Sequence, residues 1–319
     1  MNLKMLSTSE IDIDAHAQLI YNSRQESPLR NNTRTIEGIK EALQSLKEQG
    51  EEFAMFVALD ERNEELLGQL LMWLEWGEMG IARPWQPIVH PEADQEAVAI
   101  ALINHAKMLV DSHSKSRLEI WMELRNEQDE EMSSVYVPWF KKCGYELKAR
   151  EYFMDTEYSK LKALETQIPD GIEVVAMSEI SCEEVKNAVL STFRSSSDKW
   201  FATMTQSQQE SSADAWLKKN ETFDDDASIV FMEDDKIVGY NVMRIEEDQV
   251  EVGPIGVLPH YRKRGFGRSL LLASAKKLEP KSPKRVWLTV STDNAPAYEL
   301  YSSLGFVNQY QILIYTWMP

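Results

Sequence analysis

The chain of 319 residues is poor in cysteine and in positive charge, and each shortage excludes a class of protein. Two cysteines, Cys143 and Cys182, cannot form a network of disulfides or a four-thiolate zinc site, and they are interpreted as ordinary thiols of a reduced, cytoplasmic protein. The chain contains 34 Lys and Arg but 52 Asp and Glu, and the resulting net charge of −18 argues against broad nucleic-acid binding. A hydrophobic content of 43% excludes wholesale disorder.

Long hydrophobic runs are also lacking. The longest, Ala97–Ile103, is far shorter than the ~18–20 residues that cross a bilayer, so no membrane association is predicted. The five histidines show no ligand spacing such as His-Glu-x-x-His, and no metal site is predicted either.

An internal repeat is present instead. Each half contains a predicted β-hairpin with a glycine early in the returning strand, Gly68 and Gly239, and ends in a glycine followed by an aromatic residue, at Gly144 and Gly305. We therefore predict an α/β (α+β) protein made by tandem duplication, with domains at 1–158 and 172–319. A polar linker over 159–171 ends in a Pro-Asp-Gly turn signal.

A basic, glycine-containing loop stands between a predicted strand over 250–259 and a predicted helix over 268–278. Glycines let a backbone approach a ligand closely, and a helix N-terminus offers unpaired N–H groups to a phosphate. The loop has neither the register of a Rossmann glycine motif nor the Gly-Lys-Ser/Thr of a P-loop. We predict a pyrophosphate site formed by Arg262, Lys263, Arg264, Gly265, Phe266, Gly267 and Arg268.

Two motifs resemble those of the GNAT acetyltransferase superfamily. Arg262-x-x-Gly265-x-Gly267 matches the [QR]-x-x-G-x-[GA] motif, and the segment from Asn294 to Phe306 resembles the second family signature. The resemblance implies two GNAT-like domains, each with a mixed, mostly antiparallel sheet flanked by helices, arranged as in tandem proteins of the mycothiol synthase type. It also implies that acetyl-CoA is the acetyl donor, bound by the loop together with Ile255, Gly256, Val257, Asn294 and Tyr301.

Transfer of an acetyl group to an amine requires a base for the ammonium and an acid for the departing thiolate. Glu251, 11 residues before Arg262, is the candidate base by resemblance; the alternative is a solvated surface acid, with Glu246 and Glu247 as further candidates. Tyr301 is the candidate acid, although a tyrosine on an apolar helical face is usually core. A β-bulge is expected at Gly253-Pro254, because proline cannot donate to a regular ladder.

The first half departs from the family pattern where the coenzyme would bind. The segment aligned with the loop, 94–99, begins Asp94-Gln95-Glu96 and contains neither glycine nor a cation, so this domain is interpreted as degenerate and structural. The resemblance implies an N-acetyltransferase acting on a primary amine, with a small molecule favoured, and it places residues 185–217 where the family covers the acceptor. The alternatives are a non-catalytic acyl-CoA-binding module and a protein N-acetyltransferase. A monomer or a homodimer is expected.

Overall fold

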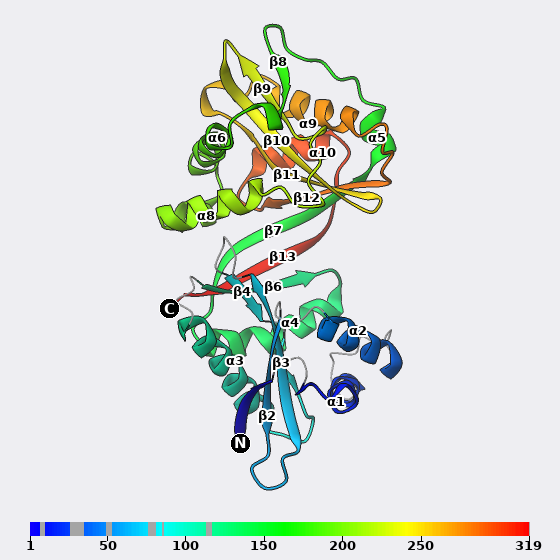
Figure 1. Cartoon of the computed structure of the whole chain (residues 1–319), viewed down its shortest axis with the longest axis vertical. Coiled ribbons are helices and arrows are strands. Elements are labelled where there is room, and N and C mark those ends of the chain that lie inside the picture. Colours follow the sequence, from blue (N-terminus) through cyan, green and yellow to red (C-terminus); the bar gives the residue numbers. More distant parts are fainter. Residues whose placement is uncertain are drawn as a thin grey trace. The chain divides into compact units, whose positions relative to one another are not determined.

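The computed structural model describes residues 1–6, 10–25, 35–48, 53–75, 81–84, 86–112 and 117–318. They form two units, shown in Figure 1. Unit 1 comprises Met1–Lys148 and Ile312–Pro319, and unit 2 comprises Ala149–Gln311. Strand β7 (Glu146–Glu157) and strand β13 (Val307–Trp317) each contribute residues to both units.

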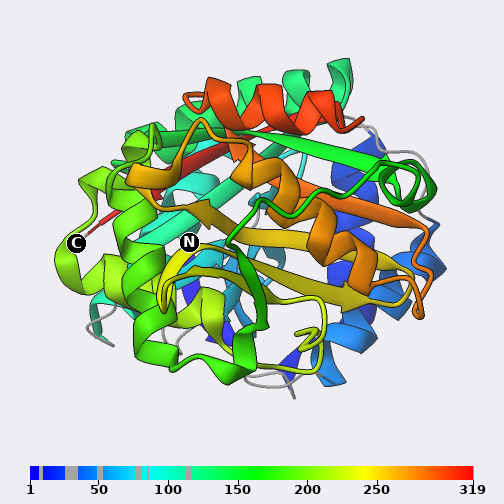
Figure 2. The same ribbon diagram turned by 90° about the horizontal axis from the view of Figure 1, so that it is seen from above.

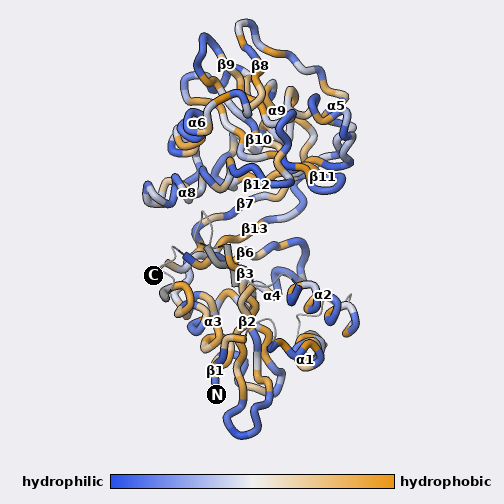
Figure 3. The backbone as a smooth tube through the Cα atoms, viewed as in Figure 1, coloured by the Kyte–Doolittle hydropathy of each residue, from blue (hydrophilic) through white to orange (hydrophobic). Residues whose placement is uncertain are grey.

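Unit 1 contains a sheet in the order β1-β2-β3-β4-β6, with β5 paired to β3. Its helices cover two apolar clusters: α3 and α4 pack around Phe56, Leu102 and Phe140, and α1 and α2 around Ile39 and Met55. Figure 3 shows the apolar course of β2 and β3 and the polar turn between them. The elements are β1 (Asn2–Leu6), α1 (Ile13–Gln25), α2 (Ile36–Glu48), β2 (Phe53–Leu59), β3 (Leu66–Glu75), β4 (Ile81–Pro84), β5 (Ile88–Val89), α3 (Gln95–Ser112), β6 (Arg117–Leu124) and α4 (Glu127–Lys142).

Unit 2 contains a sheet in the order β7-β12-β11-β10-β9-β8. Helix α9 lies along β10 and β11, as Figure 2 shows, and α6 packs on α8 and β10. The elements are α5 (Tyr158–Lys162), β8 (Glu173–Ala176), α6 (Cys182–Arg194), α7 (Lys199–Thr203), α8 (Gln206–Leu217), β9 (Ile229–Glu233), β10 (Lys236–Glu246), β11 (Gln249–Val257), α9 (Phe266–Lys277), β12 (Arg285–Ser291) and α10 (Ala295–Ser303), with short 3₁₀ turns at Met177–Glu179 and Pro259–Tyr261.

The predicted architecture is confirmed in both units. Each sheet is mostly antiparallel and contains one parallel pair, β4 with β6 in unit 1 and β11 with β12 in unit 2. The repeated glycines both stand where a side chain would clash, but against different neighbours. A Cβ on Gly68 would lie 2.8 Å from Val98 of α3, so glycine allows that helix to approach the sheet closely. A Cβ on Gly239 would lie 2.7 Å from the carbonyl oxygen of Gly256 on the neighbouring strand β11.

The boundaries of the units differ from those expected. Residues 149–157 pair antiparallel with β12, from Glu157 opposite Arg285 to Glu151 opposite Ser291, and so belong to unit 2 rather than to the first domain. The expected linker begins within helix α5, whose first residue, Tyr158, donates a hydrogen bond of 3.1 Å to the carbonyl of Ala275 on α9. The end of β13 belongs to unit 1, because its side chains complete that core.

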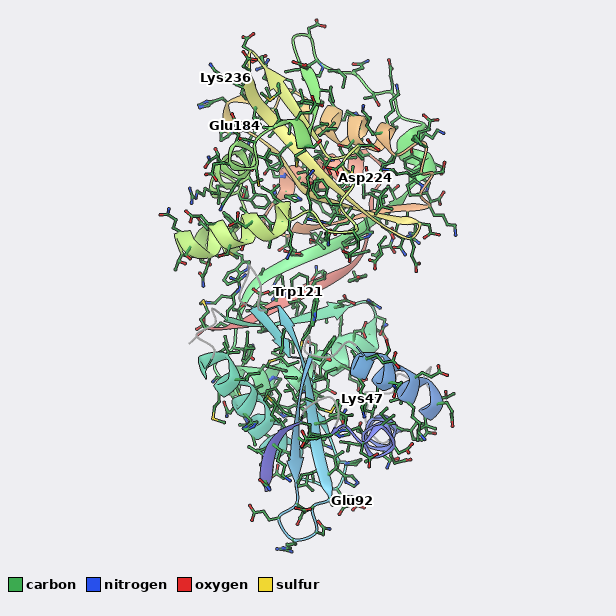
Figure 4. All side chains as sticks on the ribbon, viewed as in Figure 1. Lys47, Glu92, Trp121, Glu184, Asp224 and Lys236 are labelled. Atoms are coloured by element: carbon green, nitrogen blue, oxygen red, sulfur yellow. The ribbon has the colours of Figure 1, made fainter. Side chains whose placement is uncertain are left out.

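Local signals fix the ends of the helices that border the site. Ser181 caps α6, where its hydroxyl accepts from the amide of Glu184 (labelled in Figure 4) at 3.3 Å. Thr205 and Gln208 form a reciprocal capping box at the start of α8. Both helices therefore begin where the sequence supplies oxygen acceptors for otherwise unpaired N–H groups.

Candidate active site

The central strands of unit 2 separate partway along their length. In the described part of the chain, β11 and β12 pair from Gln249 opposite Arg285 to Glu251 opposite Trp287, after which both strands continue without pairing to each other. On its other side β11 has a register shift against β10, between Asn241 and Met243. This irregularity confirms the bulge expected at Gly253-Pro254, which is a cis peptide. The separation leaves one edge of β11 open beyond Glu251.

The open edge presents backbone N–H groups. The amide of Leu258 donates to Val238 on β10, and Gly256 lies opposite Tyr240 on the same strand. Because hydrogen-bonding directions alternate along a strand, the N–H groups of Ile255 and Val257 are directed away from β10 and toward the gap. They are two of the residues predicted to contact the coenzyme, and their amides could donate to carbonyl oxygens of a ligand between the strands.

A pair of hydroxyl groups lies against Gly256. The Thr192 hydroxyl of α6 and the Tyr240 hydroxyl of β10 are hydrogen-bonded. A Cβ at Gly256 would come within 2.5 Å of the Tyr240 hydroxyl and 2.8 Å of the Thr192 hydroxyl, so no side chain fits there. Burial raises the pKa of Tyr240 well above its usual range, and the nearby Tyr301 adds to the rise. Tyr240 is therefore a neutral donor at physiological pH.

The start of α9 forms an open cradle. Gly265 precedes the helix with φ of 83°, a left-handed conformation that favours glycine, and provides no capping side chain. Within the described residues, the amides of Phe266, Gly267 and Arg268 make no hydrogen bond to another protein group. Unpaired amides at the positive end of a helix dipole are suited to a phosphate.

The four cations of the loop fall into two groups. The Arg262 guanidinium donates to the carbonyls of Val257, Thr192 and Ser195, at 2.7 to 3.0 Å, and to the Ser195 hydroxyl at 2.9 Å. Its side chain therefore ties β11 to the end of α6 instead of projecting toward a ligand. Lys263 and Arg264 are exposed and Arg268 is half-buried, which leaves these three placed to meet phosphates. Phe266 is buried and anchors the loop in the core.

Glu251, the candidate base, is largely buried on β11. In the described part of the protein its carboxylate has no hydrogen-bond or ion-pair partner, and burial raises its pKa above the usual glutamate value. Arg244, opposite it on β10, partly offsets this rise, but the Arg244 guanidinium bonds instead to oxygens of 216–220. By contrast, the reserve candidates Glu246 and Glu247 are exposed at the β10–β11 turn. A carboxylate with a raised pKa and no internal partner is suited to accept a proton.

Tyr301, the candidate acid, lies on the buried face of α10 with 7% of its surface exposed. Burial raises the pKa of its hydroxyl to about 12, so it carries its proton at physiological pH. The helix that holds it begins at Asn294, whose side chain accepts from the amide of Ala297 as expected for an N-cap. Asn294 thus has a positioning role. A Cβ on Gly267 would lie 3.1 Å from Leu300 of the same helix, which explains the close approach of α9 to α10.

The corresponding helix of unit 1 is closed. The Asp94 carboxylate accepts from the amide of Ala97 at 3.1 Å, and its carbonyl accepts from Val98 at 3.0 Å.

The described residues contain no cluster of three His, Cys, Asp or Glu side chains suited to a metal ion. Among the same residues, no helix is both long and apolar enough to cross a membrane.

Comparison with known proteins agrees with this geometry. Residues 192–306 match the model of the acetyltransferase (GNAT) family. The ribosomal protein bS18-alanine N-acetyltransferase of Salmonella typhimurium is 36% identical over 73 residues, which are 23% of this chain and 49% of the relative. The chain thus spans about half the length of that relative. A mycothiol acetyltransferase of Saccharopolyspora erythraea is 25% identical over 281 residues, covering 82% of this chain and 80% of the relative.

Solved structures share the whole fold. A GCN5-related N-acetyltransferase from Sphaerobacter thermophilus superposes with a TM-score of 0.60 at 15% identity, covering 99% of this chain and 95% of the other. A tandem GNAT protein from the clavulanic acid biosynthesis pathway gives a TM-score of 0.55 at 15% identity, with 99% and 98% coverage. At these identities the likeness concerns the fold. Together with the family model over residues 192–306 and the relatives, it supports a tandem GNAT arrangement for this chain.

Proposed function

We propose that unit 2 binds acetyl-CoA and transfers its acetyl group to a primary amine. The observation that carries this proposal is the juxtaposition of two features. An uncapped, cationic helix N-terminus follows strand β11 after a short loop. Strand β11 separates from β12 at Glu251, whose carboxylate has no hydrogen-bond or ion-pair partner among the described residues. The first feature fits a pyrophosphate, and the second fits a thioester next to a base.

The binding roles follow from the directions of the donors. The amides at Gly265–Arg268 and the side chains of Lys263, Arg264 and Arg268 hold the phosphates. The N–H groups of Ile255 and Val257 hold the acyl and pantetheine carbonyls along the open edge of β11. Gly256 between them leaves room for the Tyr240 and Thr192 hydroxyls, which a side chain at this position would displace.

The chemical step is direct attack. Glu251 removes a proton from the ammonium, and the amine nitrogen forms a bond to the thioester carbonyl carbon. The N–H of Ile255 stabilises the charge that develops on the carbonyl oxygen. The carbon–sulfur bond then breaks, Tyr301 gives its proton to the departing sulfur, and the Tyr301 phenolate takes up the second proton that the nitrogen loses as the amide forms. Burial makes Glu251 more basic, which favours its role, and the raised pKa of Tyr301 means that this side chain carries the proton it donates.

The kind of acceptor and the cellular location are further parts of the proposal. One relative is named for an alanine of a ribosomal protein and the other for mycothiol, so the family relationship is compatible with a protein or a small-molecule acceptor. We favour a small amine, approached across α6, α7 and α8, while unit 1 has a structural role. Both cysteines are free, as expected of a cytoplasmic protein.

Calorimetric titration with acetyl-CoA tests the proposal first. We expect one site per chain, lost in Gly265→Glu and retained in Glu251→Gln. Release of coenzyme A in the presence of an amine, followed with a thiol reagent, then distinguishes an enzyme from a non-catalytic acyl-CoA-binding module. Two sites per chain would contradict the inactive role of unit 1, and no binding would refute the proposal.

A further inference from the structure

An indole ring stands beside the candidate base. Glu251 and Trp287 are opposite each other on β11 and β12, at the last paired position before the strands separate. Opposed residues project from the same face of a sheet. Their neighbours Val250, Val286 and Leu288 belong to the apolar core on the other face. The carboxylate and the indole are therefore neighbours on the face of the sheet that does not carry this core.

The indole is held in place by stacking. The ring of Phe153 on β7 is stacked on that of Trp287, with centroids 5.3 Å apart and planes inclined by 21°. Phe153 is stacked in turn on Tyr310, at 4.7 Å and 4°. Rings on adjacent strands that stack in this way stand side by side, so Phe153 covers one face of Trp287. On this face of the sheet Trp287 therefore lies between Phe153 of β7 and Glu251 of β11.

The charges on this face make Glu251 available to a ligand. Asp155 lies two residues after Phe153 on β7, and its carboxylate accepts hydrogen bonds from Arg285 and Gln309. The Arg244 guanidinium, across from Glu251, donates to the carbonyls of Trp216 and Lys218 and to Asn220. A partnerless carboxylate beside an indole face forms a composite site, since an ammonium is attracted by both and a flat group stacks on the second.

We propose that the acceptor is a small arylalkylamine without a carboxylate, whose ring stacks on Trp287 while its nitrogen reaches Glu251. This inference rests on the proposed function of unit 2. A saturated ring of the same size would lack the flat face that stacks on the indole. An amino acid would bring its own carboxylate next to Glu251 and be repelled. Phe153 acts as a positioning residue, because it fixes the orientation of Trp287.

The test compares phenethylamine with cyclohexylethylamine, which differ in the flatness of the ring. With the full chain and saturating acetyl-CoA, kcat/KM for phenethylamine should be about 3- to 10-fold higher, the range expected for one aromatic stack. Trp287→Leu should bring this ratio close to one, and Trp287→Phe should preserve part of it. Trp317→Leu, which changes a partly buried tryptophan on a strand of unit 1, is the matched control and should leave the ratio as it is.

The possible outcomes separate the two proposals. Release of coenzyme A with both amines at equal kcat/KM, a ratio that survives Trp287→Leu, or faster acetylation of phenylalanine or of a peptide would overturn the inference while the proposed function stands. Acetyl-CoA binding without release by any amine would overturn the proposed function itself. If Trp287→Leu lowers the melting temperature too far for assay, the ratios of the natural protein and of Trp287→Phe decide the question.

Discussion

The two units place a helix at the same point of the same fold, yet the N-terminus of this helix is capped by a side chain in unit 1 and uncapped in unit 2. In unit 1 the Asp94 carboxylate caps α3 and neutralises the positive end of the helix dipole. In unit 2 Gly265 leaves the amides of α9 open and lies next to cations. A carboxylate and a phosphate are alternative occupants of such a position. The comparison shows how one unit can have a built-in anion while the other is left open to an external one.

The difference is chemical more than topological. In unit 1, β4 pairs parallel with β6 at Ile81 opposite Arg117, whereas the next strand, β5, pairs with β3. In unit 2, β11 likewise leaves its parallel partner β12 after three residues. Both sheets thus divide at the corresponding place. What unit 1 lacks is an uncapped helix N-terminus with neighbouring cations after the point where the strands separate.

The largest expected effect is at the open helix. Gly265→Glu introduces a carboxylate where the phosphates are proposed to bind and strains a backbone position with φ of 83°. We expect acetyl-CoA affinity to fall by more than ~100-fold, because like charges ~4 Å apart near a protein surface cost several kcal/mol. Isothermal calorimetry measures this. The counterpart, Asp94→Gly, opens α3 but supplies no cations, so a second binding site in that variant would contradict the comparison.

The second effect is at the base. Glu251→Gln should lower kcat by at least ~100-fold, the usual contribution of a general base, with acetyl-CoA affinity retained. It should also raise the melting temperature at neutral pH. The folded-state pKa of Glu251 is raised, so the ionised side chain opposes folding once the pH exceeds that pKa, and glutamine removes this penalty. Exposed Glu246→Gln is the control, and an equal loss of kcat there would assign the base differently.

A third prediction concerns the pH profile. Below the raised pKa of Glu251 the base is protonated, so kcat/KM should rise with pH through that value and remain level above it. Tyr301, with its pKa near 12, stays protonated throughout the assay range. Tyr301→Phe should lower kcat by less than Glu251→Gln, because a thiolate can leave unprotonated. A profile that falls between neutral and moderately alkaline pH would point to another acid.

The smallest effect separates two neighbouring cations. Arg262→Ala removes hydrogen bonds from a charged donor to carbonyls of α6 and β11 and should lower the free energy of unfolding by about 2 kcal/mol. Exposed Lys263→Ala should leave stability unchanged and weaken acetyl-CoA binding by a few-fold at low salt. Denaturant titration and calorimetry measure the two. Reversed results would mean that Arg262 contacts phosphate directly.

The cradle could be predicted from sequence because it is local. Residues 262–268 are consecutive, and a glycine between a strand and a helix specifies their geometry. The irregularity at Gly253-Pro254 was predictable for the same reason, and the structure confirms it. The cationic loop gave no sign, however, that the Arg262 side chain is used internally, because most of its acceptors belong to Thr192 and Ser195, far away in the sequence.

Other parts of the site depend on tertiary contacts that no local pattern reveals. Thr192 meets Tyr240, and Phe153 meets Trp287, across long stretches of sequence. Phe153 was assigned to the first domain, because the polar linker was expected to begin only at residue 159. The alternation of side chains along β7 shows a strand, but not which sheet it joins. For this reason both the unit boundary and the aromatic wall beside Glu251 were missed.

The division of β13 between the units has a consequence for synthesis. Leu313 and Tyr315 are buried in the core of unit 1 together with Phe140, although more than 170 residues separate them from it in the chain. During translation the first half therefore lacks part of its interior until the ribosome has passed residue 315, when unit 2 has already been made. The segment that is synthesised first completes its core last, and neither half can be expressed intact by a simple cut of the gene.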